Sequence, residues 1–426
     1  MNVVQKELMP GVSLTALRTD KFKSSCLSLT IFAPMDKESV TANALLPFVL
    51  RRGTMQHPNA QSISVALDDL YGGTLEACVR QQGEVQCIGF IGSFLDDAFS
   101  LDGTAILEPA AALMGELLLC PVTENGVFRG DCVSSEGKNL ADRIRAQIND
   151  KRSYSIKRLK ELMCEGEPYG LDKHGFAEEA TSITPEKLWN QYKKLLNTAP
   201  ISLYYCGSAP LERVEKTLKN ALAALPERRN VSMPSIISDH SEVMEMRNFT
   251  DALDVTQGKL VLGWRTGGIT LRSGEYPALL VLNAIYGGTT TSKLFMNVRE
   301  RLSLCYFASS MLDKQKGVMV VSSGIEFDKY DQAKDEILAQ FDACVKGDFT
   351  DHELEAGRRA VVSSLTAAED SQGRLEDYWL GQSAADMAQK PGELADAVER
   401  VTREQVVAVA EKLRLDSIYF LKGEGV

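Results

Sequence analysis

"ITPEKLWNQYKKLLNTAPISLYYCG" (Ile183–Gly207) has a second, weakly similar copy in "VTREQVVAVAEKLRLDSIYFLKG" (Val401–Gly423). Each copy begins with a threonine suited to cap a helix, continues with an amphipathic pattern and ends in a short apolar run before glycine. Pro185 lies at the first helical position of one copy, and Thr402 and Gln405 have capping-box spacing in the other. The pattern predicts a helix followed by a strand, twice in the chain.

A second pair of similar stretches lies upstream. "LSLTIFAP…ANALLPFVLRRGT" (Leu27–Thr54) parallels "KLVLGWRT…YPALLVLNAIYGGT" (Lys259–Thr289), each predicted to be a strand, a loop and an apolar helix that stops at glycine. Two β-rich runs follow in each half, around expected hairpin turns at QQGE and DKQKG. We therefore predict an α+β fold of two homologous α/β-sandwich domains, each a mainly antiparallel sheet with helices packed on one face.

The predicted domains cover residues 1–228 and 248–426. Between them, residues 229–247 are polar and contain proline and serine, which is typical of a linker. A chain of 426 residues is long enough for two such cores.

Composition limits the function. The net charge of −11 argues against binding to nucleic acid or to an anionic membrane, because both need concentrated Lys and Arg. No apolar run approaches the roughly 20 residues that span a bilayer, and the first residues lack the pattern of a secretory signal. The nine cysteines form no CxxC pair and indicate free thiols rather than disulfides. We expect a cytoplasmic protein without nucleic-acid or membrane partners.

The motifs resemble those of the pitrilysin/insulinase family of zinc peptidases, the inverzincins, in its short, processing-peptidase-like form. The resemblance covers essentially the whole chain. The stretches that carry it are "ELMPGVSL" (7–14), "RRGT" (51–54), "LYGGTLEA" (70–77), "SITPEKL" (182–188) and "YGGTTTSKLFMNVRERLSLCYFASS" (286–310).

The resemblance implies a zinc motif, H-x-x-E-H, on the helix before RRGT, where two imidazoles one helical turn apart bind zinc and the Glu activates water. In this chain Ala44 and Phe48 occupy the histidine positions, and Pro47 occupies the glutamate position. The family's third ligand, a Glu on a later helix, aligns with Arg143. None of these four side chains can perform the zinc chemistry. None of the chain's four histidines has a partner at ligand spacing; they are His57, His174, His240 and His352. We therefore expect no zinc on this chain.

The family also places an Arg and a Tyr, seven residues apart, in its second half. Here "RERLSLCY" provides Arg299 and Tyr306, at the end of an expected amphipathic helix through SKLFMNVRER and the start of a strand. In a peptidase, a phenol O–H can donate to the carbonyl oxygen as negative charge develops, and Arg can hold the substrate main chain. The alternative is a solvated helix arginine and a core-packed tyrosine.

Two functions follow from the resemblance. In the first, the chain is the zinc-free subunit of a heterodimeric peptidase. It supplies Arg299, Tyr306 and half of an internal chamber that admits short peptides, while a homologous partner with an intact H-x-x-E-H supplies zinc. In the second, the chain is a non-enzymatic structural or peptide-binding subunit. A homodimer is possible in isolation, and the natural substrate does not follow from the sequence.

Overall fold

The computed structural model describes residues 2–228, 231–234, 242–243 and 245–425, and these form two compact units. Unit 1 comprises Met1–Arg145, Leu171–Ser235 and Gln372–Ala388. Unit 2 comprises Ala146–Gly170, Ile236–Ser371 and Gln389–Val426. Residues 229–230, 235–241 and 244 of the predicted linker lie outside the described residues. Each unit therefore combines most of one half of the sequence with a short segment of the other half.

Unit 1 contains a six-stranded sheet in the order β1-β2-β8-β3-β5-β4. Its neighbouring strands are antiparallel except for the parallel pair β2 and β8. The strands are β1 (Asn2–Met9), β2 (Val12–Arg18), β3 (Ser24–Pro34), β4 (Thr74–Gln82), β5 (Val85–Leu95) and β8 (Ile201–Gly207), and a separate two-stranded ribbon joins β6 (Thr123–Glu124) to β7 (Val127–Phe128). The predicted turn at QQGE is the β4–β5 connection, where Gly83 has a positive φ of 59°.

Unit 2 contains a five-stranded sheet in the order β11-β12-β10-β13-β9, again with one parallel pair, β13 and β9. The strands are β9 (Arg247–Leu253), β10 (Gly258–Arg265), β11 (Cys305–Asp313), β12 (Val318–Ile325) and β13 (Arg414–Gly423). Read from its other edge, this order matches β2-β8-β3-β5-β4 strand for strand. The two predicted homologous α+β domains are thus confirmed as two sheets of the same topology, with β1 as an addition in unit 1.

Local signals explain the repeated helix–strand element. Thr184 accepts a hydrogen bond from the backbone N–H of Lys187 and begins α7 (Pro185–Thr198), which leads into β8. Thr402 and Gln405 form the predicted capping box at the start of α14 (Arg403–Ala410), which leads into β13.

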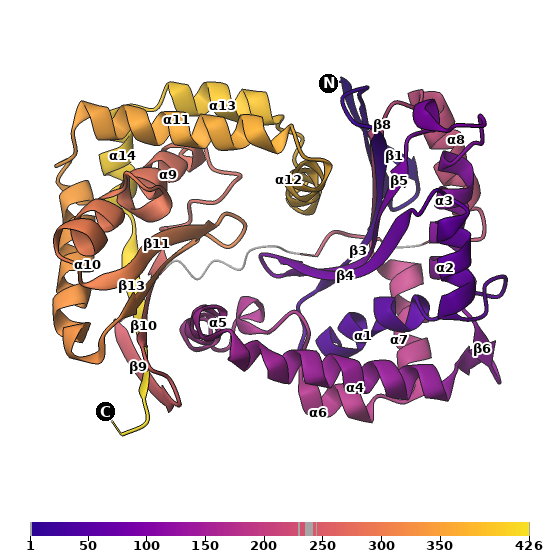
Figure 1. The fold of residues 1–426 in the computed structure, drawn as a ribbon, viewed down its shortest axis with the longest axis horizontal. Coiled ribbons are helices and arrows are strands. Elements are labelled where there is room, and N and C mark those ends of the chain that lie inside the picture. Colours follow the sequence, from indigo (N-terminus) through magenta and orange to yellow (C-terminus); the bar gives the residue numbers. More distant parts are fainter. Residues whose placement is uncertain (1, 229–230, 235–241, 244, 426) are drawn as a thin grey trace. The chain divides into compact units, whose positions relative to one another are not determined.

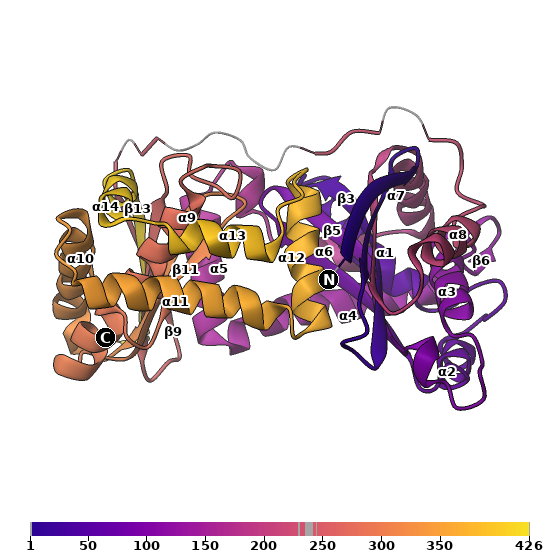
Figure 2. The ribbon, with the colours of Figure 1, turned by 90° about the horizontal axis from the view of Figure 1, so that it is seen from above.

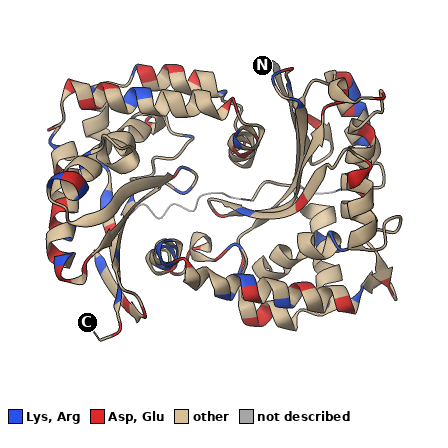
Figure 3. Cartoon of the chain, in the orientation of Figure 1, with Lys and Arg blue, Asp and Glu red and all other residues tan. Residues whose placement is uncertain are grey.

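The remaining helices pack on the sheets or on one another. In unit 1 they are α1 (Val40–Leu50), α2 (Ala60–Asp68), α3 (Leu107–Leu119), α4 (Gly130–Ala146), α6 (Ala177–Ser182), α8 (Leu211–Ala221) and α12 (Gln372–Ala384), with the short 3-10 helix η1 (Asp97–Phe99). In unit 2 they are α5 (Lys151–Met163), α9 (Tyr276–Asn283), α10 (Tyr330–Val345), α11 (Asp351–Ala368) and α13 (Pro391–Glu399), with η2 (Gln147–Asn149), η3 (Pro168–Gly170), η4 (Ala284–Gly288), η5 (Leu294–Arg301) and η6 (Phe327–Lys329). Helices α11 and α13 lie side by side (Figures 1 and 2). Acidic and basic residues are interspersed along α4 and α11, as on solvated helix faces (Figure 3).

The sheet of unit 1 has helices on both faces. Leu27, Leu29 and Ile31 of β3 belong to the apolar core beneath α1 and α3, whereas Ser28 and Thr30 of the same strand face α12 on the opposite side (Figure 1). The alternation follows from the two-residue period of a strand. Helix α12 comes from the C-terminal half of the chain and contacts β3 and β8. The prediction of helices on one face of the sheet therefore missed this second layer.

The sheet of unit 2 receives an equivalent helix from the N-terminal half. Leu159 and Met163 of α5 pack on Val261 of β10 and Tyr419 of β13. Gly263 allows this close approach, because a β-carbon there would lie 2.6 Å from Met163 Sδ. Since α5 follows α4 as α12 follows α11, the two halves exchange corresponding helices.

Candidate functional site

The first candidate site lies on α1. Ala44 is fully buried, Pro47 is buried within the helix, and Phe48 is half-buried. The helix continues to Leu50, although Pro47 provides no backbone N–H for the carbonyl one turn earlier. Ala44, Pro47 and Phe48 therefore contribute apolar packing between α1 and its neighbours, and none of them offers a metal ligand.

Arg143 on α4 lies directly against Phe48 on α1. Its guanidinium carbon is 4.4 Å from the centre of the Phe48 ring, within the range of a cation–π contact. Two residues assigned from separate motifs, one to a histidine position and the other to the third-ligand position, are thus neighbours in space. At the two positions assigned to zinc ligands, the structure has a phenyl ring and a guanidinium in contact.

These residues do not fit a zinc ion. A guanidinium cannot lose its proton at ordinary pH and repels a divalent cation, and a phenyl ring has no lone pair to donate. Across the described part of the chain, no three His, Cys, Asp or Glu side chains gather in a way that could hold a metal. His57 pairs with Glu116 (Nδ1–Oε2, 3.1 Å), His174 lies near Asp172 (3.3 Å), and His240 is outside the described residues.

The second candidate site begins at η5, which carries Arg299. The predicted amphipathic segment is a π-helix, since the N–H of Leu302 reaches back five residues to the carbonyl of Asn297 (3.1 Å). Leu294 and Val298 are buried and lie four residues apart. This spacing places two side chains on one face of a π-helix as well as of an α-helix. Arg299 lies over the ring of Phe295 at 4.6 Å and its Nε is 3.4 Å from Glu300 Oε1.

A tight turn connects η5 to β11. Ser303 has φ 50°, a left-handed conformation that glycine usually adopts at helix ends. The N–H of Ser303 bonds to the carbonyl of Arg299 (3.1 Å), and that of Leu304 bonds to Val298 (3.0 Å). The pKa of the Cys305 thiol, at the start of β11, is raised because the thiol is buried. The positive charge of Arg299 opposes part of this rise. The turn thus fixes where β11 starts relative to the arginine.

Tyr306 is the extra residue of a β-bulge. Cys305 pairs with Ile325 and Phe307 pairs with Gly324, so β11 has one residue more than β12 at this point. Bulges redirect side chains and are frequent beside functional sites. Tyr306 is 65% exposed, unlike the core-packed tyrosine of the alternative interpretation. Among the described residues, no hydrogen bond, ion pair or ring contact joins Tyr306 to Arg299.

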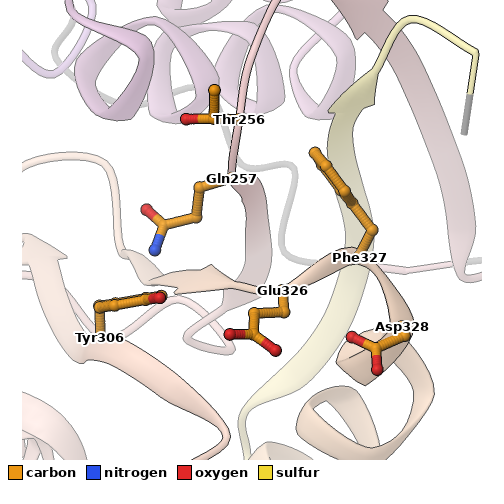
Figure 4. A pocket seen from close by; sticks show the side chains of 6 residues that line it. All are labelled: Thr256, Gln257, Tyr306, Glu326, Phe327 and Asp328. Atoms are coloured by element: carbon orange, nitrogen blue, oxygen red, sulfur yellow. The ribbon is translucent and has the colours of Figure 1, made fainter.

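Tyr306 lines an open pocket of about 560 Å³ at one end of the unit 2 sheet. The other lining residues come from the β9–β10 connection and from the segment after β12 that includes η6. Figure 4 shows them around Tyr306: Thr256, Gln257, Glu326, Phe327 and Asp328. Sequence reasoning missed these five residues. They are polar or aromatic positions at strand ends, and only the pairing of β10, β11 and β12 brings them together.

The burial pattern agrees with the cysteine prediction. All nine cysteines are free thiols, and only Cys78 and Cys120 are partly exposed. Within the described ranges, no helix is both long and apolar enough to cross a membrane.

Comparison with known proteins identifies the family. Residues 182–361 match the pattern described as the Peptidase M16 inactive domain. The chain is 34% identical over 414 residues to the "Probable inactive metalloprotease YmfF" of Bacillus subtilis, and the match covers 97% of this chain and 96% of that protein.

Solved structures show the same fold over the whole chain. A conserved protein from Enterococcus faecalis superposes with a TM-score of 0.88 at 25% identity, with complete coverage of both chains. A peptidase M16 inactive domain from Pseudomonas fluorescens gives 0.79 at 17% identity, over 100% of this chain and 99% of that one. The chain therefore belongs to the M16, insulinase-like peptidase family that its motifs resemble, as a homologue of a protein named a probable inactive metalloprotease.

Proposed function

We propose that this chain is the zinc-free subunit of a heterodimeric M16 peptidase that cleaves short peptides. A homologous partner with an intact H-x-x-E-H supplies the zinc and the general base. This chain supplies Arg299, Tyr306 and half of the chamber that holds the peptide. The observation that carries the proposal is the contrast between the two candidate sites. The zinc-motif positions are filled by a Phe48–Arg143 contact, whereas Tyr306 projects from a bulge into an open pocket.

The chemistry assigns distinct roles to the two side chains. The Tyr306 hydroxyl donates a hydrogen bond to the carbonyl oxygen of the scissile peptide as charge develops there. Arg299 offers a planar set of donors to the substrate main chain. Because Arg299 now lies on Phe295 and beside Glu300, it would have to leave these exposed contacts when a peptide binds.

The experiment mixes the purified chain with its zinc-bearing homologue and follows cleavage of a quenched fluorescent peptide. Activity is expected only in the mixture. Tyr306→Phe removes one hydroxyl and should lower kcat by about 10²–10³, and Arg299→Ala should mainly raise KM. Arg301→Ala is the matched control, because Arg301 lies on the same π-helix and pairs only peripherally with Glu336 (3.5 Å). Unchanged activity in both the Tyr306 and Arg299 variants would reject the shared site.

A second function, a non-enzymatic structural or peptide-binding subunit, is favoured by one observation. Arg299 makes its contacts with Phe295 and Glu300 rather than with Tyr306, so the pair is not assembled in the chain alone. This function predicts that mixtures bind the quenched peptide without cleaving it.

A further inference from the structure

Gln257 is held in a defined orientation at the edge of the Tyr306 pocket. Lys259 Nζ donates a hydrogen bond to Gln257 Oε1 at 2.5 Å. An ammonium group has three donors and no acceptor, so the amide atom that faces it must be the oxygen. The Gln257 NH₂ group therefore points away from Lys259, and Figure 4 shows this nitrogen on the side where Tyr306 lies.

The surroundings of Gln257 support this placement. A β-carbon on Gly324 would lie 3.0 Å from Gln257 Oε1 and 2.6 Å from Phe307, so the bare glycine in β12 makes room for both side chains. Burial lowers the pKa of Lys259, which is half-buried beside the amide. Within the described residues, the Gln257 NH₂ group donates to no other side chain or carbonyl. It is thus a fixed donor in an open pocket.

The pocket offers donors and acceptors together. Tyr306 and Gln257 can donate, whereas the carboxylates of Glu326 and Asp328, which form no ion pair in the described part of the chain, can accept. These two negative charges disfavour an anion as the ligand of the pocket. A neutral peptide main chain, which presents C=O and N–H groups in alternation, matches the whole set.

We propose that Gln257 is a substrate-binding residue that donates a hydrogen bond from Nε2 to a main-chain carbonyl of the peptide beside the scissile bond, with Lys259 as its positioning residue. This inference rests on the proposed function insofar as the ligand is a peptide. It assigns the C-terminal half a contact besides Arg299 and Tyr306. Because the carbonyl is neutral in both the ground state and the transition state, the bond contributes equally to both and appears in KM rather than in kcat.

The test uses variants that separate the donor from the contact with Lys259. Gln257→Glu keeps the length of the side chain and an oxygen for Lys259, but replaces the donor by an acceptor. It should raise KM of the mixed enzymes for the quenched peptide about threefold to tenfold, with kcat nearly unchanged. Lys259→Met, which releases the amide, should raise KM less. Gln147→Glu is the matched control, because Gln147 Oε1 also accepts a hydrogen bond from a lysine, Lys157 Nζ (2.5 Å), and Gln147 does not line this pocket.

A second measurement does not depend on catalysis. The same quenched peptide is titrated into the isolated chain, and binding is followed by fluorescence anisotropy. Gln257→Glu should weaken binding by the same factor as it raises KM. If the mixture is inactive but this loss of affinity is seen, the proposed peptidase role fails and the role of Gln257 stands. If the mixture is active and Tyr306-dependent, but Gln257→Glu changes neither KM nor affinity, the role of Gln257 is overturned.

Discussion

Arg80 and Glu376 lie 296 residues apart in the sequence and form a two-bond ion pair, Nη1 to Oε2 at 2.5 Å and Nη2 to Oε1 at 2.8 Å. Glu376 also accepts from Ser28 Oγ at 2.8 Å, and its side chain is only 1% exposed. These bonds attach α12 to β3 and β4 of the unit 1 sheet. The exchanged helix is thus fixed by a buried charge pair in addition to apolar contacts.

Removing one partner of this pair should strongly destabilise the protein. Glu376→Ala leaves the Arg80 guanidinium buried without a counter-charge, and such changes typically cost ~3–5 kcal/mol. Thermal and urea unfolding would measure the loss. Asp377→Ala is the matched control, because Asp377 is the next residue of α12 and is exposed. The double variant Arg80→Met/Glu376→Met should recover much of the stability, since no buried charge remains. Equal effects of Glu376→Ala and Asp377→Ala would contradict this role.

Acid should weaken unit 2 through Glu167. Burial raises the pKa of this carboxyl, but hydrogen bonds and charge from Arg265 (2.6 Å) and Lys316 (2.6 Å) outweigh burial and lower it below its ordinary value. A lowered folded-state pKa stabilises the protein above the unfolded value of about 4.3, and this contribution is lost as the pH falls through the folded-state pKa. The urea midpoint should therefore fall from pH 5 towards ~pH 3.

Glu167→Gln provides the comparison, because it keeps the shape and removes the titrating group. Its midpoint should be lower at pH 7 and should change less on acidification than that of the unaltered protein. If the urea midpoint falls equally steeply with pH in both proteins, Glu167 is excluded as a source of the acid sensitivity.

Restoring the zinc ligands tests the assignment of the degenerate motif. Phe48 and Arg143 are already in contact, so histidine and glutamate at these positions would lie within reach of one ion. The variant Ala44→His/Pro47→Glu/Phe48→His/Arg143→Glu should bind about one zinc per chain, with the geometry of three protein ligands and an open position. Metal analysis after dialysis would measure the amount of zinc bound per chain. The same variant with Arg143 left unchanged is the control and should bind far less. No difference between the two would show that Arg143 is not the third-ligand position.

Most thiols should be inert in the folded protein. Burial raises the pKa of Cys164 and Cys344 to about 12, so little reactive thiolate is present near neutral pH. A disulfide reagent should label at most the partly exposed Cys78 and Cys120 quickly, and all nine thiols in urea. Cys120→Ser should remove the early reaction of that thiol. A fast thiol that persists in the Cys78→Ser/Cys120→Ser variant would instead indicate an activated cysteine.

Local patterns predicted much of the fold. Thr184 and Thr402 cap their helices as expected, because capping involves residues three apart, and the hairpin turn at Gly83 needs only a left-handed glycine. The exchange of α5 and α12 was not predictable, because the apolar face of a helix does not specify which sheet it covers.

The candidate site was predictable only where a motif carried it. Arg299 and Tyr306 have a recognisable spacing, but the bulge that exposes Tyr306 depends on the register of β11 against β12. Gln257 and Glu326 belong to no motif, and strand pairing alone places them beside Tyr306. Sequence indicates which residues are chemically suited to a role, whereas register decides which of them meet.

The helix exchange also determines what a broken chain would do. A backbone cut between residues 229 and 247 would produce an N-terminal fragment with α5 embedded in unit 2 and a C-terminal fragment with α12 embedded in unit 1. The N-terminal fragment would lack α12, which packs on its sheet, and the C-terminal fragment would lack α5, which packs on its own. Each fragment would carry the helix that the other lacks. The two pieces would therefore remain associated after nicking and would need to refold together, so the halves form one thermodynamic entity although their sheets are separate.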